Sequence, residues 1–209
     1  MVKNERKRIW KLAKQTAFSC GRSRGSNKTF KLSIKKTKKI SKKITQTKTK
    51  NKKKKINGLL ASDLNSALNC FPNFLGCVPE DKLDELVFGS LPCFIIVNID
   101  SGNMPGSHWI ALGLFKGSIE IFDPLGFDIF NWSKVPCDLL DFLHRLSVTR
   151  RVHTAPRVQS DSSYLCGFYT IFYVIARKFV SFEHLFKCFC TQFLSRNDKI
   201  LYEFFKNAD

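Results

Sequence analysis

Residues 159–174 read QSDSSYLCGFYTIFYV, a polar turn followed by a run of apolar and aromatic residues. This change of composition predicts the start of a buried helix, which we place at Cys166–Phe179. The sulfur of Cys166 would then lie at the positive end of the helix dipole, where a thiolate is stabilised. Whether Cys166 is a buried thiol or a nucleophile depends on which residues folding brings to it.

The 209-residue chain has two parts with different compositions. Residues 1–57 hold 22 of the 35 Lys and Arg residues and one acid, a net charge of +21, whereas residues 58–209 have a net charge of −3. The first part is of low complexity and too polar to form a core, so we expect a disordered basic arm. We expect residues 58–209 to form the single globular domain.

The charge of the arm favours a polyanion as its partner. Few aromatic residues are present for base stacking, so we expect binding to double-stranded DNA through phosphates and independent of sequence. Nuclear import is a compatible second use, and a solubilising tail is the alternative. The expected DNA contacts are Lys35, Lys36, Lys38, Lys39, Lys42, Lys43, Lys52, Lys53, Lys54 and Lys55.

The cellular compartment is indicated by the apolar segments and the cysteines. The first residues contain no signal-peptide core, and the longest apolar run, Tyr164–Ala176, is too short to span a bilayer. Eight cysteines without a Cys-x-x-Cys pair indicate mostly free thiols in a reducing compartment, so we expect neither secretion nor a membrane. Cys188 and Cys190 near His184 are more simply buried residues than metal ligands, so no metal is expected.

Residues 58–209 are predicted to form an α+β domain, because strands and helices occur without regular βαβ alternation. We expect a small, central, mostly antiparallel sheet, packed by the buried helix that starts at Cys166. A hairpin at Lys116-Gly117 would join its two central strands. The expected strands are 93–100, 108–115, 118–126 and 149–156, and the expected helices are 62–71, 135–146, 166–179, 182–194 and 198–205.

A nucleophilic thiol needs an imidazole base, an acid that orients the imidazole, and donors for an oxyanion. His108 opens a strand directly after the flexible loop SGNMPGS, and the hairpin would bring Asp123 to the same edge of the sheet. Gln159 lies seven residues before Cys166, where its amide could join the Cys166 backbone N–H as a donor. The other histidines, His144, His153 and His184, are expected to be surface or core residues.

These motifs resemble the adenovirus-type cysteine protease. The similar segments are GSHWIALGLF, IFDPLGF and QSDSSYLCGFYTIFYV, in that order, preceded by PNFLGCVPEDKL, and together they cover about Asn73 to Phe179. Relatives of this enzyme occur in large DNA viruses and in Maverick or Polinton transposons. Its more distant kin, the SUMO-deconjugating proteases, share the fold and the order of the catalytic residues.

The resemblance implies a cysteine endopeptidase with an adenain-type or SUMO-protease-type fold. Adenoviral enzymes usually have Glu at the position of Asp123, and Asp is the choice of the SUMO-protease branch. The implied roles are nucleophile for Cys166, general base for His108, orienting acid for Asp123, oxyanion donor for Gln159, and support of the site for Trp109 and Gly167.

The resemblance further implies cleavage of capsid and core precursor proteins at Gly-containing sites, in the virion and the host nucleus. We expect a monomer that needs no cofactor for the chemistry and is stimulated by DNA. The adenoviral enzyme also uses a peptide activator that can form a disulfide with it. Residues 147–156 contain no cysteine at the corresponding place, so a disulfide-linked activator is not expected, and another peptide activator stays open.

Two other classes of function stay open, a SUMO-like or ubiquitin-like deconjugase and a non-enzymatic DNA-binding packaging protein. A further hypothesis concerns residues 56–59, Ile-Asn-Gly-Leu, which fit the aliphatic-x-Gly-x pattern that the related enzymes cut. Cleavage after Leu59 would remove the arm, and an ordinary linker is the simpler alternative.

Overall fold

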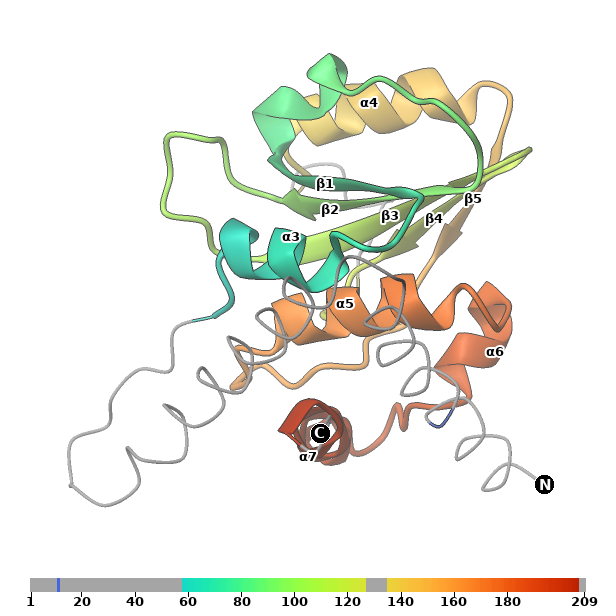
Figure 1. Ribbon diagram of the computed structural model, residues 1–209. Coiled ribbons are helices and arrows are strands. Elements are labelled where there is room, and N and C mark those ends of the chain that lie inside the picture. The colour runs from blue at the N-terminus through green and yellow to red at the C-terminus, as the bar shows by residue number, and fades with distance from the viewer. Residues whose placement is uncertain (1–10, 12–57, 127–134, 207–209) are drawn as a thin grey trace, which may run out of the picture.

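The computed structural model describes Lys11, residues 58–126 and residues 135–206. A five-stranded sheet in the order β1-β2-β3-β4-β5 crosses this part of the chain, with helices on both of its faces (Figure 1). The described chain is therefore an α+β fold. The strands are β1 Phe74–Pro79, β2 Cys93–Asn98, β3 Trp109–Phe115, β4 Ser118–Phe122 and β5 Arg151–Thr154.

The sheet is mixed, and the expectation of a mostly antiparallel sheet is wrong. β3 is antiparallel to β2 and β4, as the predicted hairpin requires, but β1 is parallel to β2 and β4 is parallel to β5. Parallel neighbours need a crossover connection. The 3₁₀ helix η3 (Glu80–Glu85) lies between β1 and β2, and helix α4 (Cys137–Ser147) lies between β4 and β5.

Strand β1 was not expected, because FLGCVP is short and lies between turn signals. It contains a register shift at Gly76, whose φ of 126° lies in the left-handed region that favours glycine. The shift lets β1 stay paired with β2 although its backbone is irregular.

The helices other than α4 lie on the opposite face of the sheet. They are α3 Ala61–Leu68, α5 Cys166–Ala176, α6 Phe182–Phe186 and α7 Leu194–Lys206. The helix expected at 182–194 stops at Phe186, and α7 begins before the expected Asp198. The amide of Asn197 accepts from the N–H of Cys190 and donates to its carbonyl, so the side chain satisfies the backbone where the helix is interrupted.

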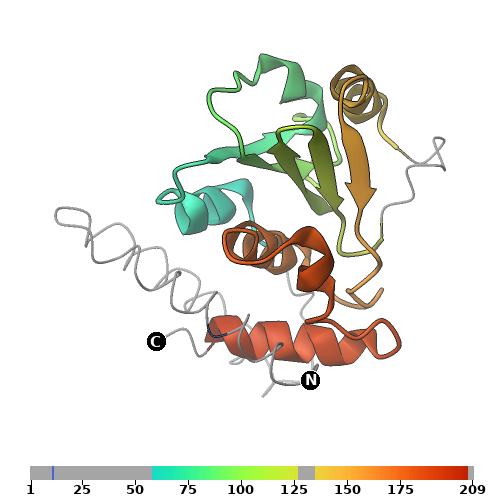
Figure 2. The same cartoon turned by 90° about the vertical axis from the view of Figure 1, so that its right-hand side faces the viewer.

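The core has two parts, one on each face of the sheet. Phe94 and Ile96 of β2 pack toward α5, whereas Ile95 and Val97 belong to the cluster that includes α4. Because both faces are covered, the central strands β2 and β3 are apolar along nearly all their length rather than alternating. Figure 2 shows α5 between the sheet and α7, and all its eleven residues are buried. This position explains why the helix is apolar all round.

Helix α5 approaches β3 most closely at Gly113. A Cβ atom on Gly113 would lie 2.3 Å from the hydroxyl of Tyr173. That hydroxyl donates to Glu120 at 2.9 Å, and the Tyr173 ring stacks on Phe122 with centroids 5.0 Å apart. Arg177 donates to the same carboxylate. These contacts fix how deep α5 lies, and therefore where its first residue, Cys166, is placed.

The substitution Gly113→Ala is expected to lower the free energy of unfolding by about 1–3 kcal/mol, because Tyr173 cannot move without losing its contacts. Urea unfolding measures this change. Gly89→Ala is the matched control, since a Cβ there meets nothing within 4 Å. Equal stabilities of the two variants would contradict the close approach of α5 to β3.

Candidate functional site

His108 directly precedes β3 and is buried. Its Nε2 lies 2.6 Å from Oδ1 of Asp123, which directly follows β4. The pairing of Ala111 with Phe122 brings these two strand ends together. Oδ1 of Asp123 also accepts from the N–H of Leu125 at 2.8 Å, which fixes the carboxylate in an Asx turn. The predicted acid therefore orients the predicted base.

Cys166 is the first residue of α5 and is buried. The side chain of Cys166 lies close enough to the His108 ring to interact with it and to raise the pKa of the imidazole. Because Nε2 faces Asp123, Nδ1 is the nitrogen left for the sulfur. The imidazole thus bridges a carboxylate and a thiol, the arrangement expected of a thiol nucleophile and its base.

The charge of His108 results from opposing effects. Burial lowers its pKa, but the hydrogen bonds to Asp123 and Cys166 together outweigh burial and raise the pKa to about 9. The ring is therefore protonated at neutral pH. This cation and the positive end of α5 both lie at the sulfur, and both stabilise a negative charge there.

Gln159 is 1% exposed and lies in the segment that leads from β5 into α5. Its Nε2 donates to the carbonyl of Ser163 at 2.8 Å, which leaves a second N–H. The first N–H groups of a helix have no partner within the helix, so the backbone N–H of Cys166 is a second donor. The second N–H of Gln159 and the N–H of Cys166 are therefore the donors that remain for the predicted oxyanion.

The other amide atom of Gln159, Oε1, is buried and has no hydrogen-bond partner among the described residues. A buried polar atom without a partner costs about 1–3 kcal/mol. Gln159 is therefore not a residue that maximises the stability of this fold.

Trp109 and Gly167 both contact Leu59, which sequence reasoning missed. The indole Nε1 of Trp109 donates to the carbonyl of Leu59 at 2.8 Å, and a Cβ on Gly167 would lie 3.0 Å from the Leu59 Cβ. Gly167 thus lets Leu59 pack beside the nucleophile. No local signal distinguishes Leu59 from the neighbouring Leu60, because its partners are 50 and more residues away.

These contacts bear on cleavage after Leu59. Its carbonyl is bound by Trp109, and the N–H of Leu60 donates to Asp63 at 3.2 Å. The peptide bond between Leu59 and Leu60 therefore has both its carbonyl and its N–H engaged in hydrogen bonds. This argues against its cleavage in the folded chain.

The remaining candidates do not form a site within the described residues. In residues 58–126 and 135–206, no group of three or more His, Cys, Asp or Glu residues could hold a metal ion. His184 contacts Ser181 at the start of α6, with 2.7 Å between Nδ1 and Oγ. The lysines expected to bind DNA lie outside the described residues. Among the described residues, free thiols include Cys77, Cys93, Cys137 and Cys166.

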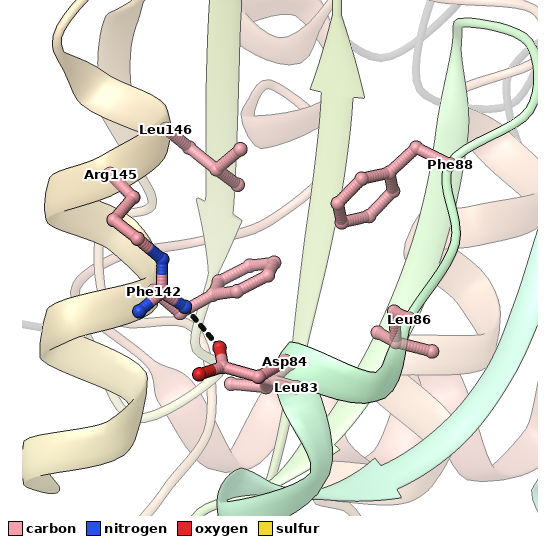
Figure 3. A pocket seen from close by; sticks show the side chains of 7 residues that line it. All are labelled: Leu83, Asp84, Leu86, Phe88, Phe142, Arg145 and Leu146. Carbon is pink, nitrogen blue, oxygen red and sulfur yellow. Dashed lines mark hydrogen bonds and ion pairs between the residues drawn. The ribbon is translucent and has the colours of Figure 1, made fainter.

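A cavity of about 310 Å³ lies on the other face of the sheet, between η3 and α4 (Figure 3). An ion pair between Arg145 and Asp84 crosses it. None of the four site residues lines this cavity, so it is separate from the candidate site. Its lining residues are Leu83, Asp84, Leu86, Phe88, Phe142, Arg145 and Leu146.

Comparisons with known proteins do not identify the chain. No protein-family model matches it, and no curated protein sequence does. Among the described residues, no helix has the length and apolar character that crossing a membrane would require.

The raised pKa of His108 predicts its titration. By NMR, the ring is expected to titrate with a midpoint near pH 9. Asp123→Asn should move the midpoint lower, because burial lowers the pKa and the carboxylate that raises it is then missing. Protonation is favoured by folding, so its contribution to stability is complete below about pH 6.5 and lost as the pH rises to about 9.

The control for this titration is Asp141→Asn, which removes an exposed carboxylate from α4 and should leave the midpoint unchanged. A wild-type midpoint near 6.5, or equal midpoints in wild type and Asp123→Asn, would contradict the assigned contact.

Proposed function

We propose that the chain is a cysteine endopeptidase that cleaves precursor proteins at Gly-containing sites while its basic arm is bound to DNA. The observation that carries this proposal is the position of His108, whose Nε2 lies 2.6 Å from Asp123 and whose ring interacts with the side chain of Cys166. The resemblance to the adenovirus-type protease, made from sequence motifs alone, leads to the same assignment.

The reaction follows from these positions. The Cys166 thiolate attacks the scissile carbonyl, and the oxyanion that forms accepts from the Cys166 N–H and from Gln159. The His108 imidazolium gives its proton to the leaving amine, which leaves a thioester on Cys166. Neutral His108 then takes a proton from water, the hydroxide attacks the thioester, and a second oxyanion collapses to release the acid. Asp123 keeps the ring oriented throughout.

The substrates and the location in this proposal rest on the resemblance and on the arm. We propose capsid and core precursor proteins as substrates, in the virion and the host nucleus. DNA would act as a stimulator, because an arm of net charge +21 keeps the enzyme on the polyanion near which such precursors are packed.

Cleavage of Gly-containing peptides by the purified chain tests the catalytic assignment. Cys166→Ala is expected to abolish cleavage, and Gln159→Ala to lower kcat by about 10²–10³ through loss of one oxyanion donor. Cys137→Ala is the matched control, since it removes an exposed free thiol on α4 and should leave the rate unchanged. Cleavage that survives Cys166→Ala would disprove the assignment.

Binding of the full chain to double-stranded DNA tests the role of the arm. With about 6–10 phosphate contacts, affinity should fall by ~10³–10⁵ between 50 and 200 mM salt. Replacing Lys52, Lys53, Lys54 and Lys55 by Gln should weaken binding and reduce the salt dependence, while cleavage of a short peptide without DNA stays the same. Equal affinity before and after these four changes would contradict a role for these lysines.

A deconjugase is the second candidate, favoured by Asp123 where adenoviral enzymes usually have Glu. Faster cleavage of a ubiquitin-like fusion than of Gly-containing peptides would select it. A non-enzymatic packaging protein leaves the contact between His108 and Cys166 without a role. Labelling of Cys166 by a thiol-directed inhibitor, lost in His108→Ala, would reject this class.

A further inference from the structure

The segment that connects β5 to α5, residues 155–165, carries Gln159 and is held from two sides. On one side, the carbonyl of Pro124 accepts from the N–H groups of Val158 at 2.9 Å and Gln159 at 2.8 Å. Pro124 follows Asp123 directly, so the turn that holds the orienting acid also holds the backbone of the expected oxyanion donor. We call residues 155–165 the Gln159 segment.

On its other side, the Gln159 segment meets α7. Asn197 is fully buried, and its Nδ2 donates to the carbonyl of Val158 at 2.9 Å and to that of Cys190 at 2.7 Å. Its Oδ1 accepts from the N–H of Cys190 at 2.8 Å. Both N–H groups and the oxygen of the amide are therefore engaged. Asn197 fixes the residue before Gln159 to the start of α7.

The next residue of α7, Asp198, is 9% exposed and contacts the residue after Gln159. Its Oδ2 accepts from the hydroxyl of Ser160, and its Oδ1 accepts from the hydroxyl of Tyr169 at 2.9 Å. Burial, together with this carboxylate, raises the pKa of Tyr169, so its hydroxyl stays a donor. Tyr169 belongs to α5, the helix that begins at Cys166. One carboxylate thus joins the Gln159 segment to the nucleophile helix.

A short path leads from Asp198 to the amide of Gln159. The carbonyl of Ser160 accepts from the N–H of Ser163 at 3.1 Å, which closes a four-residue turn. The carbonyl of Ser163 then accepts from Nε2 of Gln159 at 2.8 Å. Fixing Ser160 fixes this turn, and the turn determines where the second N–H of Gln159 points.

We propose that Asn197 and Asp198 are positioning residues for the oxyanion donors. Asn197 holds the residue before Gln159, and Asp198 holds the residue after it. Through Tyr169, Asp198 also sets the distance between the segment that carries Gln159 and the helix that carries the Cys166 N–H. This inference rests on the proposed function, because an oxyanion forms only if Cys166 attacks a carbonyl.

The expected effect is on the reaction rather than on substrate binding. An Asn at position 198 can accept only with its oxygen, so either Ser160 or Tyr169 faces an N–H group instead. A small displacement of an oxyanion donor then lowers kcat by about 10–100-fold, because donors act only at the position that the oxyanion occupies. KM should stay within about twofold, since the ground-state carbonyl gains little from these donors.

A double-mutant cycle on the full chain tests the inference. Asp198→Asn, Gln159→Ala and the double variant are compared on a Gly-containing peptide that the wild type cleaves. If Asp198 acts through Gln159, the double variant has the kcat of Gln159→Ala alone, because no positioned amide is left to lose. Independent losses that multiply in the double variant would overturn the inference.

A second readout separates positioning from general damage to the fold. Alkylation of Cys166 by iodoacetamide forms no oxyanion, so its rate should be unchanged in Asp198→Asn, whereas a peptide aldehyde, whose adduct places an oxygen at the donors, should bind more weakly. A parallel fall of the alkylation rate and the aldehyde affinity would mean a structural role only. Ser160→Ala, which breaks the same path at a half-buried residue, replaces Asp198→Asn if that variant does not fold.

Tyr169 of α5 offers a further test. Tyr169→Phe removes a hydroxyl that donates to Asp198 and leaves the aromatic ring in place. Tyr169→Phe should lower kcat, whereas Asp141→Asn, which removes an exposed carboxylate of α4, should not, and equal effects would overturn the inference. Failure of the proposed function is distinct, since the wild type itself would then neither cleave peptides nor show alkylation of Cys166 that depends on His108.

Discussion

The hydrogen bond between His108 and Asp123 is the contact on which the candidate site depends. A buried imidazolium is costly unless it is paired, and here the carboxylate lies 2.6 Å away and is itself fixed by the N–H of Leu125. Together with the side chain of Cys166, Asp123 therefore keeps the buried His108 ring protonated at neutral pH. The thiol of Cys166 lies against this charge, so its electrostatic environment is already in place before any substrate binds.

The sheet and α5 place the sulfur against that charge. The packing of Tyr173 over Gly113, and its bond to Glu120, fix the depth of α5 below β3. Leu59 packs on Gly167 and accepts from Trp109, which links the first turn of α5 to the start of β3. Helix α5 and strand β3 are thus held together at two places, one in the core and one beside the candidate site.

The parts of the fold that could be predicted from sequence are those with local signals. The hairpin turn at Lys116-Gly117 predicted the two central strands. The change of composition before Cys166 predicted the start of α5, and the order of the four site residues follows from these elements. The parallel outer strands, the break between α6 and α7, and the role of Leu59 were not predicted. The parallel pairing and the contacts of Leu59 depend on partners far away in the sequence, and the helix break depends on how the Asn197 side chain bonds the backbone of Cys190. No periodicity or turn signal reports such contacts.

The same contrast between local and distant contacts applies to the candidate site. His108 and Asp123 lie at adjoining ends of one hairpin, so a local pairing is enough to bring them together. The predicted oxyanion donors lie on the Gln159 segment and on helix α5, which are not paired with each other as two strands are. Side chains of α7 form hydrogen bonds with both and so connect them. The sequence therefore predicts the candidate site residues but gives no indication of what holds them in place. Buried polar residues on a distant helix, such as Asn197, are where such support should be sought in this fold.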